Sequence, residues 1–178
     1  MWATMGAAKD FHPEKLVIGV LAGGIGITES LLPVLRESFG PTDYVSGPIA
    51  FDFTRYYEQE MGSPLHRLFV SFERLVNPET LADLKHSTNR MEDLFRRHGR
   101  RTVNLDPGLL CLSRFVLATT KESAHRVALR SGIYVEVELL YERGTFRPVE
   151  WTYPDYRSAA YIDALNSIRA LCKAQLRP

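Results

Sequence analysis

The chain has 178 residues, of which 45% are hydrophobic and 24% charged, and its formal net charge is +1. These values are those of an ordinary soluble globular protein, long enough to bury a core without disulfides or metals. A charge so close to zero gives no long-range attraction toward nucleic acid or an anionic membrane. No apolar run reaches the ~18 residues that a membrane span requires, so we expect no membrane partner.

The cysteines and the N-terminus bear on compartment and domain organisation. Cys111 and Cys172 lie far apart, without metal-binding spacing, and so few cysteines favour a reducing cytoplasm. The first residues lack the apolar core of a signal peptide. We therefore predict a disordered start over residues 1–14, followed by a single domain over residues 15–178.

The first half of the chain predicts a β-α-β-β-α-β order, typical of a ferredoxin-like unit. Asn77 and Pro78 have the residue types of a helix start, and Gly99 that of a helix end. Pro33 would break a helix that began early, so we expect Ser30 to cap the first helix. The expected strands are 15–21, 43–53 (an edge or bulged strand), 66–76 and 101–105, and the expected helices are 30–40 and 77–99.

The second half predicts an antiparallel β-meander and a C-terminal helix, which makes the fold α+β. The meander strands are expected at 114–120, 125–129, 132–142 and 145–149, and the helix at about 158–176. Polar and apolar residues alternate along 132–142, with Glu136 and Glu138 opposite Val135 and Val137. This alternation predicts one face in solvent and the other in the core.

A glycine cluster, GVLAGGIGITE (19–29), follows the first predicted strand and raises the question of phosphate binding. Glu29 stands where the dinucleotide-binding pattern has its third glycine, and Ile25 where a phosphate-binding P-loop has lysine. We interpret the Gly23–Gly26 loop as a flexible turn between strand and helix. A weak anion site at the start of that helix is the alternative.

Polar residues concentrate in four other stretches. The stretch 51–62 offers Asp52, Thr54, Tyr56 and Tyr57 as candidate binding residues, although a polar turn after a strand would explain them too. The stretch 151–158 offers aromatic rings with Asp155 and Arg157, which would bind a ligand or merely pack and cap the last helix.

Asp106 and His125 are the candidates for acid–base chemistry. Asp106 precedes Pro107 and Gly108 at the predicted end of a strand, where the three would form a type II turn. There the carboxylate would be a base or a divalent-metal ligand, unless it only stabilises the turn. His125 lies near Lys121, so that a proton donor or acceptor and an anion-binding cation would be close together; a solvated turn is the alternative.

Six stretches, in order, resemble the uncharacterised bacterial family known as domain of unknown function 4416. They are FDFTRYYEQEMG, RLFVSFERLVNP, VNLDPG, ATTKESAHR, GIYVEVELLY and WTYPDYRS. The resemblance extends from about Lys15 to Leu176, and the glycine cluster departs from it. It implies a stand-alone cytoplasmic prokaryotic domain, but it brings no established activity, cofactor or catalytic residue. It also implies that certain polar residues lie in the defining motifs: Asp52, Thr54, Tyr56, Tyr57, Asp106, Lys121, His125, Asp155 and Arg157.

Our leading hypothesis is a site for a small anionic ligand, phosphorylated or nucleotide-like, where the strand-end loops meet. Asp106 and Asp52 would be bases or metal ligands, His125 an acid or base, and Lys121 and Arg157 anion-binding groups. A non-enzymatic protein-interaction module is the alternative. RNA binding is weaker, because the basic run at 96–101 is explained by a helix end and no RNA-binding strand motif is present. The sequence identifies neither cofactor nor oligomeric state.

Overall fold

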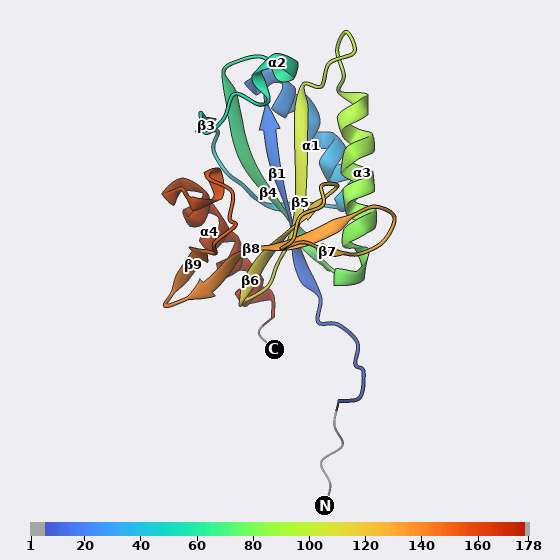
Figure 1. Ribbon diagram of the computed structural model, residues 1–178, viewed down its shortest axis with the longest axis vertical. Coiled ribbons are helices and arrows are strands. Elements are labelled where there is room, and N and C mark those ends of the chain that lie inside the picture. The colour runs from blue at the N-terminus through green and yellow to red at the C-terminus, as the bar shows by residue number, and fades with distance from the viewer. Residues whose placement is uncertain (1–5, 177–178) are drawn as a thin grey trace, which may run out of the picture.

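A computed structural model describes residues 6–176 (Figure 1). Residues 1–5, which belong to the start predicted to be disordered, lie outside the described part, as do 177–178. The strands are β1 (Glu14–Ala22), β2 (Thr42–Val45), β3 (Ile49–Phe51), β4 (Leu65–Val76), β5 (Val103–Leu110), β6 (Arg114–Thr119), β7 (Val127–Ala128), β8 (Tyr134–Glu142) and β9 (Thr145–Pro148). The helices are α1 (Ile25–Phe39), α2 (Glu58–Met61), α3 (Leu81–Leu94) and α4 (Ala159–Gln175), with the 3-10 turns η1 (Pro78–Thr80) and η2 (Asp155–Arg157).

The predicted α+β class is confirmed, with a large antiparallel sheet and a C-terminal helix. The strands form one nine-stranded sheet in the order β2-β4-β1-β5-β6-β8-β7, with β3 on β4 and β9 on β8. The second half differs from a simple meander because β6 pairs with β8 and not with β7. A turn through residues 123–126 leaves only two residues of the expected strand 125–129 to pair, so the longer β8 takes β6 as its partner.

Helices cover both faces of the sheet (Figure 1). Alternate residues of β1 and β4 pack with α1 and α3 on one face and with α4 on the other. The predicted apolar stripe of the last helix is buried as expected: Tyr161, Leu165, Ile168 and Cys172. Within residues 6–176, none of the helices combines the length and apolar character that crossing a bilayer requires.

The first helix begins earlier than predicted, at Ile25 rather than near Ser30. Thr28, Leu31 and Leu35 are buried along one side of α1, and burying this face extends the helix toward its N-terminus although Pro33 lies inside it. Gly23 just before α1 has a packing role, because a Cβ atom there would meet the backbone oxygen of Met61 at 2.6 Å.

The second long helix ends earlier than predicted, at Leu94 rather than at Gly99. Arg97 and Arg100 instead form an isolated antiparallel bridge around a tight turn. His98 and Gly99 occupy the left-handed region, with φ of 50° and 77°, which closes such a turn and cannot continue a helix. The basic run is therefore a turn that leads into β5.

The predicted turn at Asp106-Pro107-Gly108 is wrong. Strand β5 continues through these residues to Leu110, in unbroken register with β1. Proline is tolerated because β5 pairs with β6 only from Gly108 onward, which leaves the other edge of the strand unpaired at Pro107. Asp106 thus projects from the middle of a sheet strand instead of a turn.

The predicted solvent face of β8 is also wrong. Glu136 and Glu138 are buried, whereas Val135 and Val137 on the opposite face are partly exposed. The segments around His125 and Tyr153 cover the two glutamates and supply hydrogen-bond partners. Ile133 and Leu139 of the predicted core face are buried as expected, so both faces of β8 are covered in part, and long-range packing decides which side chains meet water.

Candidate functional site

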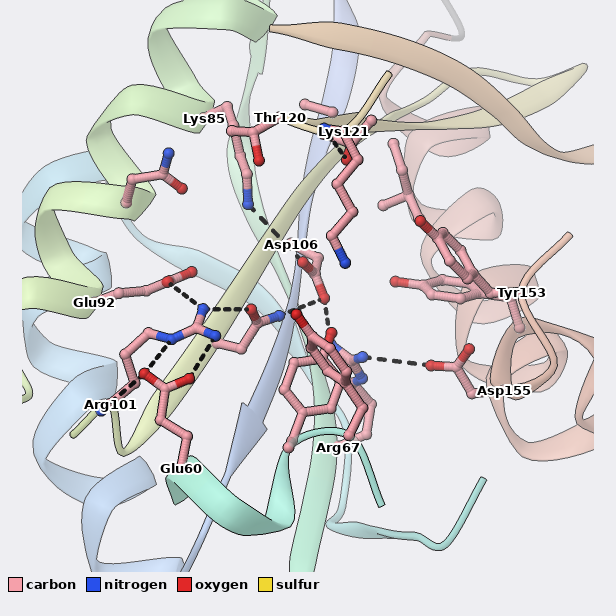
Figure 2. A pocket seen from close by; sticks show the side chains of 18 of the residues that line it. Glu60, Arg67, Lys85, Glu92, Arg101, Asp106, Thr120, Lys121, Tyr153 and Asp155 are labelled. Carbon is pink, nitrogen blue, oxygen red and sulfur yellow. Dashed lines mark hydrogen bonds and ion pairs between the residues drawn. The ribbon is translucent and has the colours of Figure 1, made fainter. Parts of the chain in front are cut away.

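A cleft of about 550 Å³ opens where β5 and β6 separate. The two strands pair only between Gly108–Leu110 and Phe115–Leu117, and the remainder of each strand forms a wall of the cleft. Side chains from α2, α3, β4, β8 and η2 complete the lining (Figure 2). Chain segments far apart in sequence therefore converge on one polar space.

Helix α3 satisfies the edge of β5 that no strand covers. The Glu92 carboxylate accepts a hydrogen bond from the Leu105 backbone N–H at 2.8 Å, and the Lys85 ammonium donates to the Leu105 carbonyl at 2.9 Å. These contacts replace the ladder that β6 would have formed, since buried backbone groups require partners. They also fix two charged side chains in the wall of the cleft.

Arg67 of β4 lies at the centre of the site and is only 2% exposed. Its guanidinium donates to Asp106 at 2.9 Å and to Asp155 at 3.4 Å (Figure 2). Gly19 of β1 makes room for it, because a Cβ atom there would lie 3.2 Å from the guanidinium and 3.0 Å from the Tyr156 hydroxyl. One buried cation thus holds two carboxylates of the cleft.

Asp106 is a rigidly held carboxylate with one engaged and one open oxygen. Oδ2 accepts hydrogen bonds from Arg67 and from the Asn104 amide at 2.8 Å. Oδ1 is 3.9 Å from the Lys85 ammonium and accepts no hydrogen bond within the described chain. Burial alone would raise the pKa of Asp106, but the two cations and the hydrogen bonds outweigh burial and lower it. The carboxylate is therefore ionised at neutral pH.

Arg101 joins α2 and α3 on the other side of the cleft. Its guanidinium contacts both carboxylate oxygens of Glu60, at 2.9 and 2.8 Å, and Glu92 at 3.3 Å. The hydrogen bond to Arg101 is the largest influence on Glu60 and lowers its pKa, whereas burial raises the pKa of Glu92. This two-point geometry fixes α2 relative to the mouth of the cleft.

The β8 wall holds a second buried network. Glu136 lies 2.8 Å from His125 Nε2 and 3.1 Å from the Arg126 guanidinium, which also donates to the Tyr153 hydroxyl at 2.6 Å. Behind it, Glu138 accepts a hydrogen bond from the Tyr153 backbone N–H at 2.7 Å. Burial, with Glu136 nearby, raises the pKa of Glu138 to about 8. Glu138 therefore holds a proton over most of the neutral pH range.

Lys121 stands apart from these pairs. Its ammonium lies 4.9 Å from the centre of the Tyr56 ring, and no ion pair joins it to a carboxylate of residues 6–176. Figure 2 shows the side chain pointing into the cleft toward Asp106. Among the basic groups that line the cleft, Lys121 is thus the cation that no carboxylate of residues 6–176 neutralises.

The structure brings together part of the predicted site. The predicted residues that line the cleft are Tyr56, Tyr57, Asp106, Lys121 and Asp155. Their functional roles stay predictions.

The other predicted residues lie outside the lining. Asp52 is exposed, and Thr54 accepts a hydrogen bond from the Tyr56 backbone N–H and so shapes the turn that carries Tyr56. His125 lies behind Glu136 and stacks on Trp151 with 5.3 Å between ring centres. Arg157 donates to three backbone carbonyls of residues 149–152 and holds that loop.

Several charged residues of the cleft were not predicted from the sequence. Each of them lies at a position where a buried side chain was expected. Arg67 interrupts an apolar strand, and Lys85 and Glu92 lie beside the apolar stripe of α3 at helical spacing. A charge within a buried pattern must find a partner or a function, which is the signal that could have identified these residues.

Metal binding was an open possibility from the sequence. Among residues 6–176, no group of three or more histidine, cysteine, aspartate or glutamate side chains has an arrangement that could hold a metal ion. The carboxylates of the cleft face arginine and lysine instead.

The chain matches the family described as Domain of unknown function (DUF4416) over residues 12–171. It belongs to this family. The match spans most of the chain, from the residues before β1 to the last turns of α4. No curated protein and no solved structure matches the chain significantly. The DUF4416 family description names no activity, so the function has to be argued from the cleft itself.

Proposed function

We propose that this DUF4416 protein binds a small anionic ligand, phosphorylated or nucleotide-like, in the cleft between β5 and β6. The observation that carries the proposal is Lys121, a cation directed into the cleft that forms no ion pair with a carboxylate of the described residues. Lys121 is exposed, and an ammonium with three donors is a common phosphate-binding group.

Other groups of the cleft support a bound ligand. The Tyr156 hydroxyl is buried and has no hydrogen-bond partner within the described chain. Tyr56 is 65% exposed and presents its ring at the mouth, where it could stack on a base or sugar once Lys121 contacts an anion. The volume of about 550 Å³ lies within the range of ordinary small-molecule sites.

Calorimetric titration with inorganic phosphate, sugar phosphates and mononucleotides tests the proposal. We expect at least one of these anions to bind, and Lys121→Met to weaken its binding about tenfold or more, since a hydrogen bond to a charged group contributes roughly 1.5–3 kcal/mol. Lys173→Met, an exposed lysine of α4, is the matched control and should leave binding unchanged. Equal effects of the two substitutions, or no binding of any anion, would contradict the proposal.

We also propose that the first half of the chain is a ferredoxin-like unit. The order β2-β4-β1-β5, with neighbouring strands antiparallel and with α1 and α3 packed on the same face, supports it. A cytoplasmic location is proposed as well, and it is supported by Cys111 and Cys172, which are both free thiols.

A further inference from the structure

We infer that the ligand of the cleft is a phosphorylated polyol, such as a sugar phosphate or the sugar phosphate of a nucleotide, and that Asp106 binds one of its hydroxyl groups. The inference rests on the proposed function, because it takes Lys121 as the group that binds the phosphate.

The first step concerns the open oxygen of Asp106. The side chain is 25% exposed, and its Oδ1 accepts no hydrogen bond from residues 6–176. Meanwhile Oδ2 is held by Arg67 and Asn104, which prevents the carboxylate from turning away. An ionised carboxylate oxygen that is fixed in a cleft accepts a hydrogen bond from whatever occupies the cleft.

The second step concerns the kind of donor. Two cations already flank the carboxylate: the Arg67 guanidinium at 2.9 Å from Oδ2 and the Lys85 ammonium at 3.9 Å from Oδ1. Lys121 points toward the same space (Figure 2). A further cation, such as a ligand ammonium, would be repelled by these three charges. A neutral donor would not be repelled, so a hydroxyl group fits the position best.

The third step joins the two ends. Lys121 and Asp106 face one continuous cleft, so the phosphate and the hydroxyl can belong to a single molecule (Figure 2). Thr120 and Asn89 also line this space and offer neutral donors and acceptors to further hydroxyl groups. A polyol bearing one phosphate is the simplest ligand with both features.

Calorimetric titration of the wild-type protein with four probes tests the inference without any variant. The probes are ribose 5-phosphate, inorganic phosphate, ethyl phosphate, which has no hydroxyl group on its carbon chain, and phosphoethanolamine, which carries an ammonium there. We expect ribose 5-phosphate to bind about tenfold or more tightly than ethyl phosphate, as a hydrogen bond to a charged acceptor predicts. Phosphoethanolamine should bind no better than ethyl phosphate.

Two substitutions then test which residue binds the phosphate and which binds the hydroxyl group of the ligand. Asp106→Asn should reduce the preference for ribose 5-phosphate over ethyl phosphate, but it should not weaken the binding of inorganic phosphate, because it removes a negative charge from the cleft. Lys121→Met should weaken the binding of all four probes by similar factors. Asp163→Asn replaces an exposed carboxylate of α4 outside the cleft lining. It should change neither the preference for ribose 5-phosphate nor the affinity for any of the four probes.

The outcomes separate the two proposals. Equal affinities for ribose 5-phosphate and ethyl phosphate, both dependent on Lys121, would overturn the polyol inference and leave anion binding intact. Tighter binding of phosphoethanolamine would also overturn it, because Asp106 would then accept an ammonium. Failure of all four probes to bind would overturn the inference and would count against the proposed function as well.

Discussion

Arg67 shows how one residue can stabilise both the fold and the site. Its buried guanidinium compensates the charges of Asp106 and Asp155, and neither carboxylate has another cation at hydrogen-bonding distance in the described chain. Replacing Arg67 therefore removes one charge and leaves two carboxylates in a poorly solvated place.

We expect Arg67→Met to lower the free energy of unfolding by about 3–5 kcal/mol, the usual cost of breaking a buried ion pair. Arg96→Met removes an exposed arginine that pairs with Asp93 on the surface, and it should cost only about 0–1 kcal/mol. Urea unfolding of both variants measures the difference. If Arg67→Met lowered the free energy of unfolding no more than Arg96→Met does, the buried ion pair would not be important for stability.

Glu138 makes stability depend on pH, because burial raises its pKa from the ordinary value of 4.5 to about 8. Between these values the folded protein holds a proton that the unfolded chain has released. Rising pH therefore removes stability in this window, by at most about 1.4 kcal/mol per pH unit. Glu138→Gln abolishes this titration, so its free energy of unfolding should fall less than that of the wild type from about pH 5 to about pH 8.

Urea unfolding at several pH values measures this effect. Glu142→Gln, an exposed glutamate at the end of the same strand, is the control and should follow the wild-type pH profile. Parallel profiles for wild type and Glu138→Gln would mean that Glu138 is ionised in the folded protein at neutral pH.

At the scale of the elements, the junction of β5 and β6 determines whether the cleft exists. The strands approach so closely at Gly108 that a Cβ atom there would clash with the Val116 carbonyl oxygen and lie 2.7 Å from the Phe115 ring. Beyond this point the strands separate, and Lys85 and Glu92 form hydrogen bonds with the free backbone edge of β5 at Leu105. The cleft is thus a consequence of where pairing stops.

Gly108→Ala should destabilise the protein by about 1–3 kcal/mol or more, because the added methyl group must displace backbone as well as a ring. Gly26→Ala is the matched control in α1, where nothing lies within 4 Å of the added atom. It should stabilise by about 0.4–1 kcal/mol through the lower entropy of the unfolded chain. Thermal or urea unfolding measures the stability of both variants. If Gly26→Ala lowered the free energy of unfolding as much as Gly108→Ala does, the packing argument would be contradicted.

The elements also show where local pattern is a sufficient guide. Strand β4 and helix α4 lie within one or two residues of their predictions, because β4 contains a run rich in strand-forming apolar residues and α4 has an apolar stripe at helical spacing. Asp106-Pro107-Gly108 has a strong local turn pattern, yet pairing with β1 along the whole of β5 outweighs it. Long-range packing likewise buries Glu136 and Glu138, which the local pattern predicted to be in solvent.

At the scale of the whole molecule, one hydrophobic cluster spans both halves of the sheet. Val17 of β1 and Phe69 of β4 share it with Leu139 of β8 and with the buried side of α4. A shared core couples the two halves energetically, so we expect residues 15–176 to unfold as one unit.

Native-state hydrogen exchange measures this coupling. The most protected amides of β1 and β8 should open with similar free energies, each close to the global free energy of unfolding. Markedly weaker protection throughout β8 would instead divide the chain into two folding units. That result would also contradict the single domain predicted from the sequence.

The sequence by itself determined the α+β class, the family and the apolar stripe of α4, and it selected Asp106, Lys121 and Asp155, which line the cleft and whose functional roles stay predictions. These features depend on short-range periodicity or on motifs within one segment. Only the tertiary structure decided that Asp106 lies inside a strand, that Arg67 joins it to Asp155, and that His125 and Arg157 support the cleft without lining it. The physical reason is that the partners of a buried charge come from distant segments, and no local pattern specifies which segments will meet.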